Sequence, residues 1–278
     1  MKPIIVMQTD FGVGGGSAMY GTIKKVDPEV EVFDSRLLIE KFNVKEASRS
    51  LKNCVAYWPA GTIFVSVVDP GVGTSRRASV ARLKNGSYVV TPDNGTLTEL
   101  LDDPGIEEIR VIDETRNRLK GTEKVSIFHG RDLFAYCAAK LASGIIDYAG
   151  VGEAYPVAEV VRYEELGYTC ETGKVTGFVS GMMRMFGNLE SSIPIAAFEQ
   201  AGFISGSKVH VQIAENGEVK VDHAIAYETS FGWVPEGDEV VYNSSDGVIG
   251  IGINLGDFIA RYNIGVGKNW TIVITEEK

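Results

Sequence analysis

The sequence is organised around residues 67–77, which read Val67-Val68-Asp69-Pro70-Gly71-Val72-Gly73-Thr74-Ser75-Arg76-Arg77. The apolar, largely β-branched run at 62–68 is typical of a strand buried on both faces. That strand must end near Asp69, because Pro70 cannot continue a central ladder and the glycines allow a sharp turn. Since ligands of open α/β sheets bind outside the carboxyl ends of strands, the stretch predicts a carboxylate and two arginines in a ligand-binding position. The alternative is a capped turn with solvated arginines.

Composition excludes several classes of function. The chain has 278 residues and a net charge of -10, which argues against a nucleic-acid partner. The three cysteines, Cys54, Cys137 and Cys170, lie far apart, and with only three histidines they form no pattern typical of zinc. We therefore predict no metal and a reducing cytoplasmic location. No apolar stretch approaches the length of a membrane span, so we expect no membrane partner.

A second carboxylate stands at another predicted strand end. The apolar residues 4–8 predict a buried strand that runs into Thr9-Asp10-Phe11-Gly12. The glycine-rich loop 12–17 lacks a glycine where Ser17 stands and lacks the lysine of a P-loop, so it predicts neither a dinucleotide nor a nucleoside triphosphate. Ser17 and Asn43 are each placed to cap a following helix.

The pattern of elements changes near residues 155–172. Before that region, predicted strands alternate with helices, which favours an α/β/α domain with a mostly parallel sheet over residues 1–160. After it, short strands dominate, and residues 170–278 predict a smaller, mostly antiparallel β domain. Asn85-Gly86 and Asn216-Gly217 are strong hairpin signals, one in each half.

His129 is the only histidine in the first half of the chain. It opens a Gly-Arg-Asp turn at a predicted helix start, where the helix dipole disfavours an imidazolium, so we expect a neutral ring. A carboxylate, a guanidinium and an imidazole on separate strand-end loops can orient and deprotonate a water molecule.

Seven short segments follow one another in a fixed order: Thr9-Asp10-Phe11-Gly12, Val67–Thr74 with Arg76-Arg77, Pro92-Asp93-Asn94-Gly95, Phe128-His129-Gly130-Arg131-Asp132, Phe186-Gly187-Asn188-Leu189, Asn243-Ser244-Ser245-Asp246-Gly247 and Asn254-Leu255-Gly256. In this order they resemble the S-adenosyl-L-methionine (SAM) hydroxide adenosyltransferase family, which comprises SAM hydrolases related to the SAM-dependent fluorinase and chlorinase. The resemblance spans almost the whole chain.

The resemblance implies a fold, an assembly and a reaction. The C-terminal domain is expected to be barrel-like, and the chain to form a homotrimer with SAM between the N-terminal domain of one subunit and the C-terminal domain of the next. Water is expected to attack the ribose C5′, which gives adenosine and L-methionine. SAM is the substrate, and no cofactor or metal is implied.

The resemblance also implies roles for residues of the first half. Asp69, Arg76 and His129 match the set that activates water. Asp10 matches the carboxylate that accepts both ribose hydroxyls, and Phe42 falls where an aromatic ring covers the ribose side of the pocket.

Four further positions complete the implied site. Phe186 and Asn188 match the segment that contacts adenine, and Ser245 falls where a serine contacts the methionine carboxylate. Gly130 stands where the halogenases carry a halide-contacting serine, which favours water as the nucleophile.

One departure keeps other functions open. The family usually has an aspartate before Phe-Gly-Asn that holds the methionine ammonium, whereas this chain has Met183-Arg184-Met185. An arginine would repel an ammonium and suit an anion. The alternatives are a hydrolase of another 5′-substituted adenosine and a non-catalytic binder of adenosine or SAM, with a halogenase a distant third.

Overall fold

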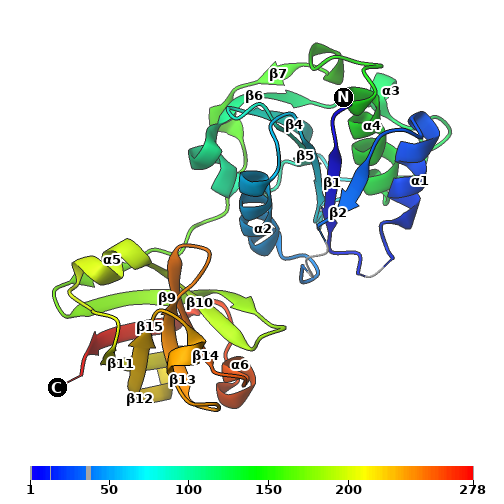
Figure 1. Cartoon of the computed structure of the whole chain (residues 1–278). Helices are drawn as coiled ribbons and strands as arrows, with labels where there is room; N and C mark the ends of the chain where they lie inside the picture. The colour runs from blue at the N-terminus through cyan, green and yellow to red at the C-terminus, as the bar shows by residue number, and fades with distance from the viewer. Residues whose placement is uncertain (1, 13, 36–38, 278) are drawn as a thin grey trace. The chain divides into compact units, whose positions relative to one another are not determined.

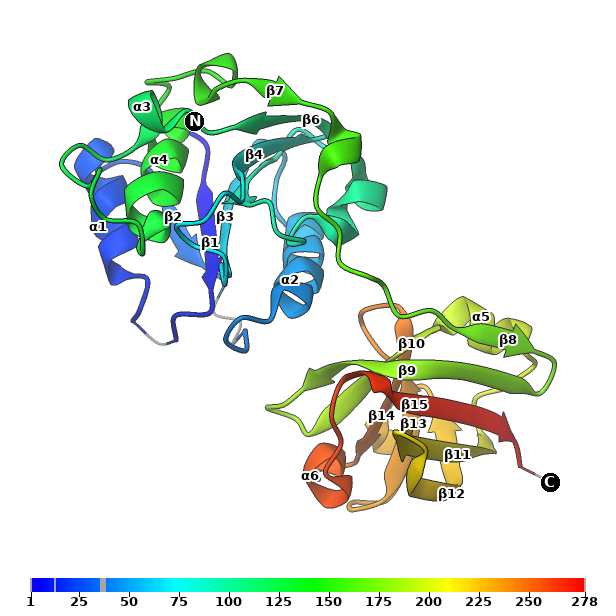
Figure 2. The ribbon, with the colours of Figure 1, turned by 180° about the vertical axis from the view of Figure 1, so that it is seen from behind.

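The computed structural model of the chain describes residues 2–12, 14–35 and 39–277. Val13, in the glycine-rich loop, lies outside these residues. The chain forms two compact units that divide between Tyr163 and Glu164 (Figures 1 and 2). We describe each unit by itself.

The first unit is built on a mixed sheet with the strand order β2-β1-β3-β5-β4-β6-β7. Pairs β2–β1, β1–β3 and β3–β5 are parallel, whereas β5–β4, β4–β6 and β6–β7 are antiparallel. Its strands are β1 (Ile5–Thr9), β2 (Val32–Asp34), β3 (Ile63–Val67), β4 (Ala78–Leu83), β5 (Tyr88–Pro92), β6 (Ile106–Val111) and β7 (Ala154–Tyr155). Its helices and helical turns are α1 (Ser17–Val26), α2 (Val44–Tyr57), η1 (Thr98–Leu100), η2 (Leu101–Gly105), α3 (Glu114–Asn117), η3 (Gly130–Ala135), α4 (Tyr136–Ala142), η4 (Ala149–Val151) and η5 (Val157–Glu159).

Helices cover both faces of this sheet. Figures 1 and 2 show α2 on one face and α1 with α4 on the other. Successive residues of β3 point to opposite faces, so Ile63 and Val65 pack in the core under α1 and α4, and Phe64 packs in the core under α2. The three-layer arrangement expected from the alternating pattern is confirmed, and the apolar run of β3 is explained by burial on both sides.

The parallel register of β1 and β3 brings two predicted strand ends together. Thr9 pairs with Val67, so the chain leaves both strands at the same edge of the sheet. Asp10 follows β1 directly and Asp69 follows β3 after Val68, so both carboxylates lie at the carboxyl edge, where parallel sheets bind ligands.

The two predicted helix caps have different outcomes. The Asn43 side chain accepts a hydrogen bond from the Glu46 amide and caps α2, as expected. The prediction for Ser17 is wrong, because Ser17 is the first residue of α1 and Gly16 precedes it with no side-chain cap. Instead, the Ser17 amide donates a hydrogen bond to the Gly14 carbonyl, which closes the glycine-rich turn that leads into α1.

The second unit is a β-barrel closed by seven strands. Its order is β10-β14-β13-β12-β11-β15-β9, and pairing of β9 with β10 closes the ring, while β8 extends it beside β9. All of these pairings are antiparallel except β12–β13. The strands are β8 (Thr169–Glu171), β9 (Lys174–Met183), β10 (Asn188–Pro194), β11 (Ser207–Glu215), β12 (Glu218–Glu228), β13 (Glu239–Asn243), β14 (Val248–Ile253) and β15 (Gly267–Glu276), with helices α5 (Ile195–Gln200) and α6 (Phe258–Tyr262) and the turn η6 (Phe231–Trp233). The barrel-like domain is thus confirmed.

Alternation explains the barrel's interior. Along β11, Val209, Val211 and Ile213 are buried, and the residues between them face outward. Asn216-Gly217 joins β11 to β12, and both residues adopt positive φ, which is the backbone that a tight hairpin turn requires.

Helix α2 is amphipathic and packs by one stripe. Its buried residues, Ala47, Ser48, Leu51 and Val55, recur at helical spacing, and the rest of the helix faces outward. None of the helices in the described ranges has the length and apolar character needed to cross a bilayer.

The Asn43 cap supplies a test of the fold. Asn43→Ala should lower the free energy of unfolding by about 1 kcal/mol, because the Glu46 amide loses its partner. Urea unfolding followed by far-UV circular dichroism measures the change. Asn43→Ser, which keeps a capping oxygen, should stay close to the native protein. Equal losses in both variants would show that the cap is not the source.

Candidate active site

A pocket of about 440 Å³ lies at the carboxyl edge of the first unit's sheet. It is open to one side and receives side chains from the ends of β1 and β3, from the turn before α2 and from the turn before η3. The lining residues are Asp10, Phe11, Lys41, Phe42, Val67, Asp69, Val72, Ile127, Phe128, His129 and Gly130.

Three of the predicted residues form one chain of contacts beside this pocket. The Arg76 Nε donates to both carboxylate oxygens of Asp69 at 3.0 Å, and its Nη2 makes a second, short bond to Asp69 Oδ2. The same Nη2 lies 3.0 Å from His129 Nδ1. The Asp69 and Arg76 side chains are almost fully buried, so water competes little with these bonds.

The contact with Arg76 defines the state of His129. A guanidinium carries only donors, so Nδ1 must accept the bond, and the neutral ring carries its proton on Nε2. Burial first, and then the positive charge of Arg76, lower the pKa of His129 below its ordinary value of 6.5. The ring is therefore neutral at pH 7, but burial and Arg76 are the causes, rather than the helix dipole we expected.

Asp10 is the second carboxylate of the pocket. Its Oδ2 accepts a hydrogen bond of 2.8 Å from the Phe42 amide. Phe42 holds a positive φ of 66°, which is unfavourable for a residue with a side chain, and its ring is two-thirds exposed. The strained turn thus orients Asp10 and adds an aromatic side chain to the pocket lining.

Two contacts fix the loop that carries Asp69. The Asn94 side-chain amide donates to the Val68 carbonyl, which anchors the end of β3. Gly73 has a positive φ of 75°, and a Cβ there would lie 2.7 Å from the Ser126 carbonyl oxygen. Only glycine fits this approach, which brings the loop against the segment leading to His129.

Gly130 also lies in the pocket wall. A Cβ at this position would stand 3.2 Å from Met19 Sδ and 3.3 Å from the Phe11 ring. A serine here would have to displace these neighbours by a few tenths of an ångström.

Sequence reasoning missed several lining residues. Lys41 and Ile127 border the pocket and lie in none of the sequence segments named above, whereas Val72 lies within the segment 67–74 but received no role there. Phe11 and Phe128 pack edge to face, 5.9 Å apart, and form an apolar wall. The only available signal was position, since each residue adjoins a predicted strand-end or turn residue.

The remaining predicted residues lie in the second unit. Phe186 stands exposed in the turn between β9 and β10, Asn188 begins β10 and is buried, and Ser245 is exposed in the turn between β13 and β14. The buried Ser244 hydroxyl donates to Glu190 Oε1 at 2.6 Å and ties that turn to β10.

Asn188 has an unusual environment. Its Oδ1 is buried and has no hydrogen-bond partner among the described residues. A Cβ on Gly252 would come within 2.3 Å of this oxygen and 3.1 Å of the Phe231 ring, so the amide and the ring both pack closely against the Gly252 backbone. A buried amide oxygen without a partner, close to an aromatic ring, fits recognition of a planar, hydrogen-bonding group.

Other titratable residues have ordinary structural partners. Arg77 donates to Glu159 and stacks over Tyr155. His210 on β11 and His223 on β12 contact Asp222 and Glu239 respectively. Among the described residues, no group of three or more His, Cys, Asp or Glu side chains is placed to hold a metal ion.

The fold and this arrangement define an α/β unit joined to a β-barrel, with a largely apolar pocket in the first unit that carries two carboxylates and an imidazole. The sequence matches the SAM hydroxide adenosyltransferase N-terminal domain over residues 5–152 and the corresponding C-terminal domain over residues 185–271. The chain therefore belongs to the SAM hydroxide adenosyltransferase family, which is related to fluorinase.

Relatives of known name support this assignment. An (R)-S-adenosyl-L-methionine hydrolase of Thermus thermophilus is 31% identical over 284 residues, with 98% of this chain and 99% of that protein covered. A fluorinase of an Actinoplanes species is 25% identical over 297 residues, covering 98% and 97%. The crystal structure of an uncharacterized conserved protein from Thermotoga maritima superposes with a TM-score of 0.85 at 32% identity, covering 98% of this chain and all of that one.

The Arg76–His129 contact predicts a measurable titration. In Arg76→Gln the pKa of His129 should rise, because the guanidinium charge is lost while Asp69 remains nearby. Ring-proton NMR against pH can follow all three histidines, and His210 and His223 serve as internal references. Arg76→Lys, which keeps the charge, should give a smaller rise. An unchanged His129 titration in Arg76→Gln would contradict the assigned contact.

Proposed function

We propose that this protein hydrolyses SAM to adenosine and L-methionine, with Asp69, Arg76 and His129 directing a water molecule to the ribose C5′. The observation that carries the proposal is the contact chain from Asp69 through Arg76 to His129 beside a pocket that also holds Asp10. Membership in a family of SAM-cleaving enzymes supports the choice of substrate.

The geometry supports a division of labour between the three residues. Asp69 is the acceptor for a proton of the attacking water. The Nε2–H of neutral His129 holds the water oxygen, since Nδ1 is engaged by Arg76. Arg76 is a positioning residue that locks the other two.

The reaction balances without a cofactor. The water oxygen forms a bond to C5′ as the C5′–S bond breaks, and the bonding pair goes to sulfur. The sulfonium thereby becomes the neutral thioether of methionine. The proton from water passes to Asp69 and then to solvent. Because the leaving group is good, alignment of water with the C5′–S bond is the protein's main contribution.

Asp10 and the residues of the barrel would bind the nucleoside. A carboxylate with two acceptor oxygens suits the two ribose hydroxyls, and the Phe42 amide fixes its orientation. We assign adenine to Asn188 and to Phe186, two residues before it, and the amino-acid carboxylate to Ser245.

We also propose that the chain acts as a homotrimer in which each site draws residues from two subunits. Each unit exposes apolar side chains near its proposed binding residues: Phe42 and Ile127 in the first, Phe186 and Trp233 in the second. Large apolar side chains in such groups favour association with another surface.

Water is favoured over halide as the nucleophile. The pocket offers charged and hydrogen-bonding groups that orient water, and the wall at Gly130 leaves little space for a serine. The relatives described above point the same way, since identity to the Thermus hydrolase is 31% and identity to the Actinoplanes fluorinase is 25%.

A second candidate is cleavage of an adenosine whose 5′-substituent is anionic. The observation that favours it is exposed Arg184, two residues before Phe186, where an acid would suit the methionine ammonium. A binder without turnover is the remaining alternative.

The first experiment incubates purified protein with SAM and separates adenosine and methionine by chromatography. Native protein should form both in equal amounts, and Asp69→Ala and His129→Ala should lower kcat by about 10²-fold or more, because each removes a group that orients water. His210→Ala, on the barrel surface, is the matched control and should keep full activity.

Other outcomes separate the alternatives. Bound SAM or adenosine without product would contradict the hydrolase and support a binder. Turnover only of a 5′-substituted adenosine with an anionic tail would support the second candidate, and Arg184→Ala would then raise KM.

Asn188 supplies a separate test of the adenine assignment. Asn188→Leu should raise KM for SAM by about tenfold while kcat changes little, because it removes a hydrogen bond remote from C5′. Steady-state kinetics measures the two constants. A loss confined to kcat would contradict the assignment, and circular dichroism of the variant checks that the barrel is intact.

A further inference from the structure

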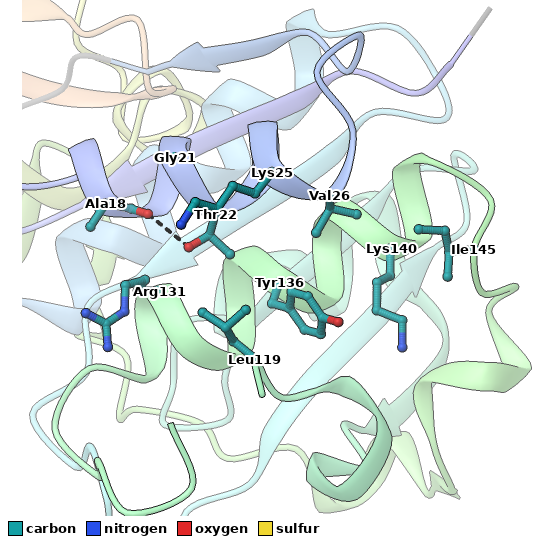
Figure 3. Close-up of a pocket in the computed structure, with 10 residues that line it drawn as sticks. All are labelled: Ala18, Gly21, Thr22, Lys25, Val26, Leu119, Arg131, Tyr136, Lys140 and Ile145. Carbon is teal, nitrogen blue, oxygen red and sulfur yellow. Dashed lines mark hydrogen bonds between the residues drawn. The ribbon is translucent and has the colours of Figure 1, made fainter. Parts of the chain in front are cut away.

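A second and larger pocket, of about 660 Å³, lies on the first unit between α1 and α4. Figure 3 shows its lining: α1 along one side, and η3 with α4 along the other. The lining residues are Ala18, Gly21, Thr22, Lys25, Val26, Leu119, Arg131, Tyr136, Lys140 and Ile145. It shares none of them with the candidate active site.

The charge of this pocket is opposite to that of the chain. Its lining holds three basic residues and no acidic one, although the whole chain carries a net charge of -10. Arg131 is paired with the buried Asp132. Lys140 donates to the Arg116 carbonyl and to Asn117, which hold it in place without neutralising it. Lys25 has no carboxylate partner among the described residues. Two uncompensated positive charges thus face one pocket.

The rest of the lining is apolar and open. Val26, Leu119 and Ile145 supply aliphatic surface, and the Tyr136 ring lies between Leu119 and Lys140 (Figure 3). The Thr22 hydroxyl donates to the Ala18 carbonyl, so it is satisfied within α1.

Gly21 on α1 contributes to the open space of this pocket. Glycine weakens a helix interior relative to alanine, so it usually has a packing reason. Here a Cβ would meet no atom within 4 Å, so no neighbour requires glycine. The small residues of α1, Ala18 and Gly21, leave space beside the helix instead of admitting a close neighbour.

We propose that this pocket binds a small organic anion with an apolar body, its anionic group held by Lys25 or Lys140 and its body packed against Tyr136 and Leu119. Cations at the rim of an apolar cavity favour such a ligand, because the charged groups fix its orientation and the apolar wall supplies the buried area. The proposal does not depend on the reaction at the active site.

The test uses the full chain and two probes of one shape, 4-phenylbutyrate and the neutral 4-phenylbutan-1-ol, in isothermal titration calorimetry. The acid should bind at least about tenfold more tightly than the alcohol, as expected for a charge-assisted contact. Lys25→Gln or Lys140→Gln should weaken binding of the acid and leave the alcohol unchanged, and acid binding that survives both replacements together would contradict the proposal. Lys52→Gln, on α2, is the matched control and should change neither.

A second pair of variants tests the place of binding. Gly21→Leu fills the pocket from α1 and should abolish binding of the acid, whereas Gly21→Ala should retain it; both replacements favour the helix, so misfolding is not expected. Equal affinity for acid and alcohol, no binding of the acid, or binding that survives Gly21→Leu would overturn the proposal. A change in sedimentation coefficient in Gly21→Leu would also overturn it, since the pocket would then be a subunit contact.

Discussion

The parallel pairing of β1 with β3 is the constraint on which the candidate active site depends. Because Thr9 pairs with Val67, both strands end at the same edge of the sheet. Asp10 and Asp69, which come just after these strands, are therefore placed at that edge. Buried side chains reinforce this pairing, since Gln8 on β1 donates to Ser66 on β3 and to the Ala47 carbonyl of α2. The sheet and the helix that precedes the pocket are thereby held as one body.

At that edge, the charges of Asp69 and Arg76 neutralise each other, and His129 adds no further charge. Asp69 and Arg76 bury a carboxylate with a guanidinium, and the bidentate contact offsets the cost of removing both from water. His129 joins them as a neutral ring, because burial and the positive charge of Arg76 both disfavour the protonated form and lower its pKa. The result is a set of fixed dipoles and one carboxylate, an arrangement that can hold water in one orientation.

Much of this was predictable from the sequence, because it is encoded locally. Buried strands that end in Asp10 and Asp69, the two Asn-Gly hairpins and the Asn43 cap each depend on a few neighbouring residues. The closure of the barrel is less local. Strands β9 and β10 are neighbours in sequence, but their pairing contains a bulge, and the ring closes only when every other strand is in place.

The features that could not be predicted from the sequence depend on tertiary packing. The state of His129 follows from burial and from Arg76, fifty-three residues away. The basic pocket needs α1 and α4 side by side, and nothing in either segment alone indicates a cavity.

The closed barrel has a consequence for how copies of this chain can associate. Strand β9 is paired along both edges, with β15 on one side and with β8 and then β10 on the other. Within the described residues, the ring leaves only the outer edge of the three-residue β8 unpaired, so strand addition, the route by which many sheets join or aggregate, has little purchase on it. Contacts made elsewhere on the barrel must use side chains, so single substitutions at the surface can adjust them while the barrel itself stays unchanged.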